Sequence, residues 1–182
     1  MRKLLFISLV TVLLVTPAFA QLAAPGVDNS PKVGTQAPDF ALGRAYTNVA
    51  AKLKDFQGKK NVLLMFFPAA FTAGCTTEFT EAGKMFDQFT ALNIELIGIS
   101  RDQLASQNKF KEAVGAKNNF VPDMELEISG KYDAISANRT SKRYYFLIDQ
   151  TGKIVWKSSN GSLIPTAKLL ADIGPVLKSS SN

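Results

Sequence analysis

The stretch NVLLMFFPAAFTAGCTTEFT, residues 61–80, decides the fold of this chain. It opens with an unbroken apolar run over residues 62–67, which is typical of a central strand covered on both faces. Pro68 ends the run, because proline cannot donate to a strand ladder. From Cys75 to Leu92 the apolar residues follow helical spacing, at Phe79, Ala82, Met85, Phe86 and Phe89. The pattern predicts a buried strand, a loop, and a helix whose first turn holds the cysteine.

The remaining segments alternate between strand and helix patterns. Strand patterns occur at residues 38–42, 49–56, 94–100, 143–149 and 153–157, the last two forming a hairpin across residues 150–152. Helix patterns occur at residues 102–116, with Asp102 as the cap, in a short stretch within 124–132, and from Pro165 to a stop or kink at Gly174-Pro175. This order predicts an α/β fold with a mixed rather than an all-parallel central sheet.

The N-terminus has the layout of a secretory signal peptide. Arg2 and Lys3 precede an apolar core over residues 4–15, and AFA at residues 18–20 is a cleavage site of small residues. The apolar run is short for a membrane span, and an uncleaved anchor is the alternative. We expect a signal peptide at residues 1–20, a flexible leader at 21–31, one domain at 32–178 and a disordered tail at 179–182. Export, to a periplasm or out of the cell, is the expected localisation.

The charge of the chain argues against a nucleic-acid partner. The formal net charge of +6 falls to +4 once Arg2 and Lys3 are removed. The nearest approach to a basic cluster, Lys52, Lys54, Lys59 and Lys60, is interpreted as a solvated turn face. No glycine-rich phosphate loop follows a strand, so no nucleotide cofactor is expected.

Cys75 is the only cysteine, and the chain contains no histidine. These counts exclude an intramolecular disulfide, a Cys-x-x-Cys redox site, Cys-His and Ser-His-Asp catalysis and the commonest zinc sites, so no metal is expected. Cys75 is therefore either a buried structural thiol or a reactive one. In the second case the N–H groups and dipole of the helix start favour its thiolate. Thr72 is spaced to bring its hydroxyl near the sulfur, and Gly74 leaves backbone room beside it.

Residues 68–75, PAAFTAGC, match the Pro-x-x-x-Thr-x-x-Cys signature of the peroxiredoxins, which they resemble. The likeness spans roughly residues 32–157. VGTQAPDF at 33–40 is similar to the family's N-terminal opening, DFQGK at 55–59 to its turn before the central strand, and RYYFLID at 143–149 to the strand with its active-site arginine. The resemblance implies a thioredoxin-like fold, a mixed central β-sheet flanked by helices, and thiol peroxidase activity without a cofactor.

The resemblance also implies a role for each residue of the motif. Cys75 would attack a peroxide as the thiolate and become a sulfenic acid. Thr72 would hydrogen-bond the thiolate and the bound peroxide, and Arg143 would donate to both. The other implied roles are water exclusion by Pro68, substrate contact by Gly74 and the Cys75 N–H, and support by Glu78. A plain helix cap for Thr72 and a sheet-end salt bridge for Arg143 are the alternatives.

The chain departs from many peroxiredoxins at Thr80. In the Q-type group a second, resolving cysteine often lies at this position, five residues after the first. The chain therefore resembles one-cysteine members, similar to the Q-type and alkyl hydroperoxide reductase E-like groups. Its sulfenic acid would be reduced by an external thiol of unknown identity, and a homodimer is expected only by analogy with the family.

Three functions remain open from the sequence. The first is an exported thiol peroxidase acting on hydrogen peroxide or organic hydroperoxides. The others are a thioredoxin-fold binding protein and a redox sensor or chaperone without peroxidase turnover. Thr72 and Arg143 in their expected contexts favour the peroxidase, whose substrate pocket has Phe71, Phe120 and Pro122 as candidate lining residues.

Overall fold

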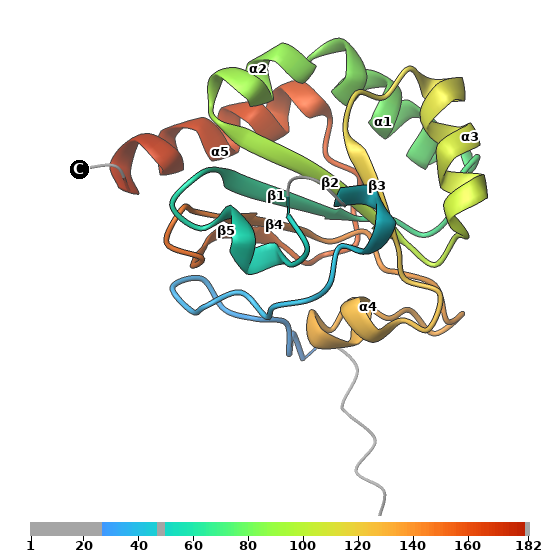
Figure 1. Ribbon diagram of the computed structural model, residues 1–182, viewed down its shortest axis with the longest axis horizontal. Coiled ribbons are helices and arrows are strands. Elements are labelled where there is room, and N and C mark those ends of the chain that lie inside the picture. The colour runs from blue at the N-terminus through green and yellow to red at the C-terminus, as the bar shows by residue number, and fades with distance from the viewer. Residues whose placement is uncertain (1–26, 47–49, 181–182) are drawn as a thin grey trace, which may run out of the picture.

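A five-stranded sheet in the order β3-β2-β1-β4-β5 forms the centre of the computed structural model, which describes residues 27–46 and 50–180 (Figure 1). The strands are β1 (Asn61–Phe66), β2 (Ile94–Ser100), β3 (Asn119–Pro122), β4 (Tyr145–Ile148) and β5 (Ile154–Ser158). Strands β1, β2 and β3 are parallel, whereas β4 is antiparallel to both β1 and β5. The predicted α/β class with a mixed sheet is confirmed.

Helices cover both faces of this sheet (Figure 1). They are α1 (Ala73–Lys84), α2 (Phe86–Ala91), α3 (Leu104–Val114), α4 (Glu127–Lys131) and α5 (Thr166–Ser180), with 3-10 turns η1 (Gly43–Tyr46) and η2 (Leu53–Phe56). Helices α1, α2 and α5 lie on one side, and α4 lies on the other with the N-terminal segment. No helix in the described part of the chain combines the length and the apolar content that crossing a membrane requires.

Strand β1 is buried on both faces, as its unbroken apolar run predicted. Leu64 and Phe66 pack into a cluster with the N-terminal segment and α4. Leu63 and Met65 pack into a second cluster with α1, α3 and α5. All four are at most 1% exposed. Burial of such a side chain stabilises a fold by roughly 1.5–3 kcal/mol relative to exposure. The strand is therefore a rigid base for the loop that follows it.

The prediction of one continuous helix from Cys75 to Leu92 is wrong, because the structure has two helices there. The structure divides it at Met85, which has φ −101° and ψ 13°, into α1 and α2. Gly83 lies just before the break, and glycine costs a helix about 1 kcal/mol relative to alanine. A Cβ on Gly83 would approach the Gly115 carbonyl oxygen to 2.7 Å, so this close packing requires the residue that weakens the helix.

The two strands predicted before β1 are also wrong. Residues 38–42 contribute only an isolated bridge from Ala41 to Lys52. Residues 53–56 form η2 instead of a strand. Asp55 causes this turn, because its carboxylate accepts the backbone N–H groups of Ala51 and Lys52 at 3.0 and 2.9 Å. Such local side-chain bonds compete with a strand ladder.

Two helix ends differ from their predictions. Helix α3 has Gln103 as its N-cap, so Asp102 does not cap it. Helix α5 contains Pro175 and continues to Ser180, so of the stop or kink predicted at Gly174-Pro175 the stop is wrong. Buried apolar residues of α5 lie on both sides of the proline, and their packing outweighs the backbone hydrogen bond that Pro175 cannot donate. These residues are Leu169, Ile173 and Leu177.

Parts of the predicted organisation lie outside the described residues. These are the signal peptide at 1–20, the leader as far as residue 26, residues 47–49 of one predicted strand, and residues 181–182 of the tail. Strand β3 lies in a segment that the sequence pattern left irregular. Helix α4 confirms the short helix predicted within residues 124–132.

Candidate active site

The site lies where β1 ends and the chain leaves the sheet. Pro68 is the second residue after this end, and α1 begins at Ala73. Because β4 is antiparallel to β1, the residues that precede β4 lie at this same end. The Phe66 N–H donates to the Tyr144 carbonyl at 2.9 Å and fixes this alignment. The sheet topology thus brings the residue before Tyr144 to the start of α1.

Cys75 and Arg143, 68 residues apart, meet at this point. Cys75 is the third residue of α1, and its side chain is fully buried in the cluster beneath the helix. Arg143 Nη2 donates to Cys75 Sγ at 3.3 Å. The sulfur therefore lies beside the first turn of a helix and a guanidinium, both of which favour a thiolate.

Arg143 is held by a buried carboxylate. Its Nη1 donates to Glu78 Oε2, and the two side chains are 10% and 1% exposed. Glu78 lies one turn after Cys75 on α1, so both face the arginine. The other oxygen of Glu78 accepts the hydroxyl proton of Tyr145, at the start of β4. Each oxygen of this carboxylate thus has a partner. The sequence predicted a supporting role for Glu78 but nothing for Tyr145.

Burial and pairing shift the ionisation of these groups in opposing ways. Burial raises the pKa of Glu78 to about 7, although Arg143 and Tyr145 both act to lower it. Burial acts to lower the pKa of Arg143, but Glu78 and Cys75 outweigh it and raise that pKa. Burial, and then Glu78, raise the pKa of Tyr145, which keeps its proton and remains a donor. Glu78 is the group that titrates near neutral pH.

Thr72 has a different hydrogen bond from the one predicted. It is the N-cap residue of α1, yet its hydroxyl donates to the Ala69 carbonyl at 3.0 Å. A hydroxyl has one proton, so this bond rules out donation from Thr72 to the sulfur in the same state. The oxygen keeps lone pairs that can accept a hydrogen bond. The plain cap alternative also lacks support, because the side chain makes no cap bond to the helix.

A second set of polar residues anchors the loop after β1. Asp102 accepts the Ala70 N–H and the Ser100 hydroxyl proton, each at 2.8 Å. Gln107, in α3, donates to Ser100 Oγ at 2.9 Å, and both residues are fully buried. Sequence reasoning assigned Asp102 to a helix cap and missed this anchor. Its position two residues after a parallel strand, at the edge where α/β folds place their sites, was the available signal.

The other two predicted site residues, Pro68 and Gly74, differ in their exposure. Pro68 is half-buried and borders a shallow groove with Ala69, Arg101 and Met124. Gly74 is exposed, and a Cβ there would lie 3.3 Å from Arg143 Nη2.

The three candidate pocket residues differ in their exposure. Phe71 is 56% exposed with φ +64°, whereas Phe120 is 4% exposed and packs on Phe79 with ring centroids 4.8 Å apart. Phe120 therefore belongs to the core and not to an open pocket wall. Pro122 ends β3 and is half-buried.

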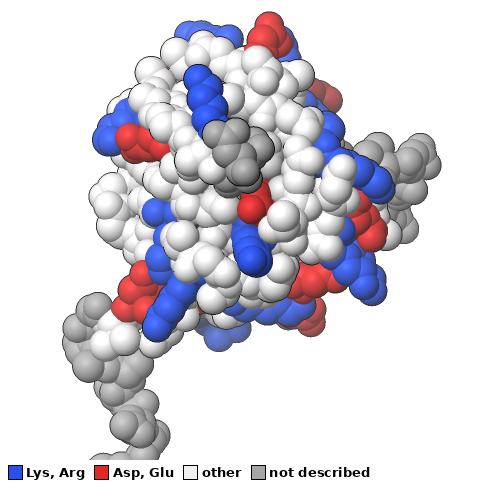
Figure 2. Space-filling model, turned by 90° about the vertical axis from the view of Figure 1, so that its left-hand side faces the viewer, with Lys and Arg blue, Asp and Glu red and all other residues white. Residues whose placement is uncertain are grey.

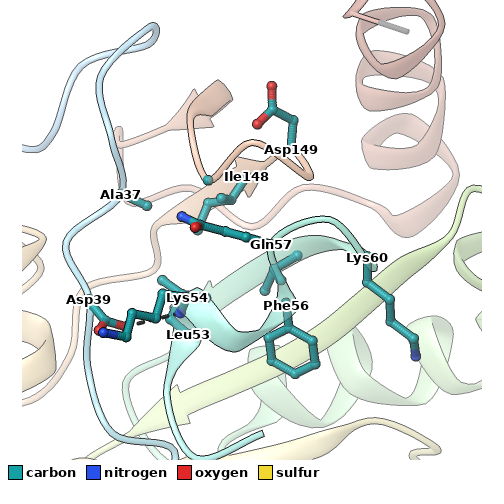
Figure 3. Close-up of a pocket in the computed structure, with 11 residues that line it drawn as sticks. Ala37, Asp39, Leu53, Lys54, Phe56, Gln57, Lys60, Ile148 and Asp149 are labelled. Carbon is teal, nitrogen blue, oxygen red and sulfur yellow. Dashed lines mark hydrogen bonds between the residues drawn. The ribbon is translucent and has the colours of Figure 1, made fainter.

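A separate cavity lies at the opposite end of β1 (Figure 3). It is bordered by Val62, Gln57, Lys54 and Lys60, at the start of the strand. Val62 and Phe66 are four residues apart at about 3.3 Å each, so the cavity borders the strand roughly 13 Å from its thiol end. It does not serve Cys75.

On the one face shown in Figure 2, the surface charges do not form a continuous basic patch. On the face shown in Figure 2, Lys and Arg side chains are interspersed with Asp and Glu. Lys60, from the predicted solvated turn face, pairs with Glu95 at 2.7 Å. Over residues 27–46 and 50–180, no three His, Cys, Asp or Glu side chains are grouped so that they could hold a metal ion.

Comparison with known proteins gives consistent matches along this chain. The model of the AhpC/TSA family matches residues 33–157. Peroxiredoxin 2 of Picrophilus torridus is 36% identical over 131 residues, which are 68% of this chain and 64% of that protein. Peroxiredoxin Bcp of Bacillus subtilis is 29% identical over 68% of this chain and 82% of its own length.

Solved structures match the fold over a larger fraction of this chain than the sequence relatives do. The reduced 2-Cys peroxiredoxin of Plasmodium vivax has a TM-score of 0.73 at 28% identity, over 82% of this chain and 99% of that one. Peroxidoxin BcpB of Mycobacterium tuberculosis has a TM-score of 0.69 at 25% identity, over 81% and 97%. The mixed sheet is thioredoxin-like, its thiol lies at a helix start, and an arginine from the segment before β4 contacts that thiol. With these matches, the chain belongs to the AhpC/TSA family of peroxiredoxins, thiol-dependent peroxidases.

Proposed function

We propose that this protein is a one-cysteine peroxidase in which Cys75 attacks the peroxide and Arg143 stabilises the reacting atoms. The observation that carries the proposal is the position of Arg143 Nη2, 3.3 Å from Cys75 Sγ. Its partner Glu78 is buried and is itself held by the buried Tyr145, so the guanidinium is fixed before substrate binds. Fixed donors beside developing charge are usually the largest contribution to catalysis.

The reaction forms one bond and breaks one. The Cys75 thiolate attacks a peroxide oxygen, the S–O bond forms, and the O–O bond breaks. The leaving oxygen takes a proton and departs as water or an alcohol, and the sulfur becomes a sulfenic acid. Arg143 donates to the sulfur and to the oxygens. Thr72, whose hydroxyl donates its proton in a hydrogen bond to the Ala69 carbonyl, accepts a hydrogen bond from the peroxide O–H.

Thiolate formation alone contributes a small part of the rate. An ordinary cysteine thiol is about 3% ionised at pH 7, so complete ionisation gains at most about thirtyfold. Enzymes commonly accelerate their reactions by about a millionfold or more. Most of the acceleration must therefore come from donors directed at the breaking O–O bond. Arg143 supplies them.

Regeneration requires a thiol from outside the chain. Cys75 is the only cysteine, and Thr80 stands on α1 where a resolving cysteine would otherwise lie. The reductant thiol attacks Sγ, water leaves, and a second thiol reduces the mixed disulfide. Because Cys75 is fully buried, a bulky reductant requires local opening of the segment around it. Small thiols should therefore reduce the enzyme faster than folded protein thiols.

The exported location and a homodimer belong to the same proposal. Export rests on Arg2, Lys3, the apolar core and the AFA site of the N-terminus. The homodimer rests only on analogy with the family.

The test is peroxide turnover with dithiothreitol as the reductant. We expect consumption of hydrogen peroxide and of cumene hydroperoxide, and addition of one oxygen atom to Cys75 when the reductant is omitted. Cys75→Ser is the control and should show neither. Consumption that does not depend on Cys75 would refute the peroxidase. Oxidation of Cys75 without sustained peroxide turnover would favour a redox sensor.

A further inference from the structure

Tyr145 connects the active-site arginine to a distant part of the chain. It opens β4 and is fully buried in the cluster under α1 and α5. Its hydroxyl donates to Glu78 and accepts the backbone N–H of Ile164 at 3.4 Å. Glu78 in turn binds Arg143, which reaches Cys75. A continuous series of hydrogen bonds thus runs from the segment before α5 to the sulfur.

We propose that Tyr145 is a positioning residue for Arg143, and that its hydroxyl couples the Glu78–Arg143 pair to residues 159–165, which precede α5. This inference rests on the proposed peroxidase function. It assigns Tyr145 no contact with the peroxide. Its effect passes through Glu78.

The strand geometry explains why a tyrosine works at this position. Residues two apart on an extended chain face the same side, so Arg143 and Tyr145 both point toward α1. Tyr144 points to the opposite face, where its ring packs on Phe146 with centroids 6.4 Å apart. Tyr145 therefore reaches the oxygen of Glu78 that Arg143 leaves free, whereas Tyr144 cannot.

Without this hydroxyl, Glu78 would be left half-satisfied. Its side chain is 1% exposed, so solvent cannot replace a lost partner. A buried carboxylate with one unpartnered oxygen is costly and tends to take a proton instead. A protonated Glu78 holds Arg143 less firmly, because the charge that fixes the guanidinium is gone.

The segment at residues 159–165 rests on the first turns of α1. Leu163 Cδ1 lies 3.9 Å from the position that a Cβ on Gly74 would take. The Thr166 N–H, at the start of α5, donates to Glu81 Oε2 at 3.2 Å. Tyr145 links this segment to the arginine through Glu78, so movement of the segment should change the position of Arg143 relative to Cys75 Sγ.

The titratable groups around Glu78 determine how the oxidation rate should depend on pH. Arg143 and Tyr145 face it from the β4 side, and Cys75 and Glu81 lie on its own helix. Burial raises the pKa of Glu78 to about 7, while Arg143 and then the Tyr145 hydrogen bond oppose that rise. Loss of the Tyr145 hydroxyl should raise the pKa of Glu78 further.

The experiment compares Tyr145→Phe with the matched control Tyr144→Phe. Stopped-flow oxidation of Cys75 by hydrogen peroxide is measured across pH, with melting curves to verify folding. We expect Tyr145→Phe to slow oxidation by about 10- to 100-fold and to move its acid limb to higher pH, because a bond to a charged group is lost. Tyr144→Phe should change neither. In a Glu78→Gln background, Tyr145→Phe should cause little further loss.

The outcomes separate this inference from the proposed function. A folded Tyr145→Phe with the rate and pH profile of the wild type would overturn the positioning role, and so would losses that simply add to those of Glu78→Gln. If wild-type Cys75 does not react with peroxide, the peroxidase fails instead. In that case the pH dependence of Cys75 alkylation by iodoacetamide tests the positioning role. That role requires the alkylation profile to shift in Tyr145→Phe and to stay unchanged in Tyr144→Phe.

Discussion

The two supports of the active site differ in kind. The first support, called the arginine side, consists of Arg143, Glu78 and Tyr145; Arg143 contacts the sulfur and is held by the other two, which are buried. The second, called the loop side, consists of Asp102 and the loop after β1; Asp102 accepts the Ala70 N–H and does not reach the sulfur. The arginine side supplies charge at the reacting atoms, whereas the loop side fixes a backbone position.

This difference has consequences for activity, stability and pH. Changes on the arginine side should alter the peroxide rate and its pH dependence, because Glu78 titrates near neutral pH. Changes on the loop side should reduce stability and have a smaller effect on the rate, with the same pH dependence. If both sides responded alike, the division between charge and geometry would be wrong.

Arg143→Lys should produce the largest effect. The substitution keeps the positive charge but loses the planar fork that contacts Glu78 and Cys75 together. We expect peroxide oxidation of Cys75 to slow by about 10²- to 10³-fold, as when one fixed donor is removed from a charged transition state. Stopped-flow kinetics measures this loss.

The control for this substitution is Arg101→Lys. Arg101 lies at the same edge of the sheet, but it donates to the Met124 and Arg139 carbonyls at 3.1 Å. Its replacement should leave the rate nearly unchanged. Equal rates in Arg143→Lys and the wild type would remove Arg143 from the mechanism.

Glu78→Gln should produce the next largest effect and remove a pH step. Wild-type oxidation should slow as the pH falls through about 7, since protonation of Glu78 loosens Arg143. Glutamine cannot titrate, so the variant should be slower by about 10- to 100-fold above that pH and lack this step. Glu81→Gln, one turn away and bound to the Thr166 N–H, should retain the step.

Stability should respond to pH in the opposite direction. The pKa of Glu78 is raised on folding, to about 7 from about 4.3 in an unfolded chain, so its stabilising contribution is complete below the lower value. That contribution is lost as the pH rises through about 7. Urea unfolding at several pH values should show this loss in the wild type but not in Glu78→Gln. A parallel pH dependence in both proteins would contradict the assignment.

The sequence predicted the members of the site better than their contacts. Cys75 and Arg143 could be paired because the motif and the β4 pattern both resemble a known family, and residues 94–100 matched β2 at both ends. The position of Asp102 after a strand indicated the edge of the sheet, but its partners and those of Tyr145 could not be predicted, because they depend on segments distant in the chain meeting at that edge. Local patterns carry no information about which residues meet there.

The errors in the fold have a similar cause. Pro175 is a strong local stop, yet α5 continues because buried residues on both sides of the proline pack against the sheet. Residues 53–56 have a strand pattern, but Asp55 binds the backbone just before it. Tertiary packing overrides local propensity in the first case, and one local carboxylate does so in the second.

Asp102→Ala should have a moderate effect confined to the loop side. The Ala70 N–H and the Ser100 hydroxyl both lose their acceptor, which should lower the free energy of unfolding by about 1–3 kcal/mol. The rate should fall less than in Glu78→Gln, with the acid limb unmoved. Asp87→Ala is the control, because this exposed carboxylate makes only a long 3.4 Å ion pair with Lys117. A shifted acid limb in Asp102→Ala would show that the loop also controls charge.

Gly74→Ala should have the smallest effect, and activity and stability should change in opposite directions. Alanine favours a helix over glycine by up to about 1 kcal/mol, so the variant should be slightly more stable. Its Cβ would lie 3.3 Å from Arg143 Nη2, a tight contact that displaces the guanidinium by a few tenths of an ångström. We expect oxidation of Cys75 to slow by only a few-fold, since the donor remains present.

Gly130→Ala on α4 is the matched control for this last substitution. A Cβ there meets Ile135 Cδ1 at 3.7 Å, an ordinary van der Waals contact far from the sulfur. Its melting temperature should rise similarly, while its peroxide rate stays at the wild-type value. If Gly74→Ala also kept that rate, Arg143 would have more freedom than its buried partners imply. The arginine side would then tolerate displacement as the loop side does, and the contrast between the two supports would rest on charge alone.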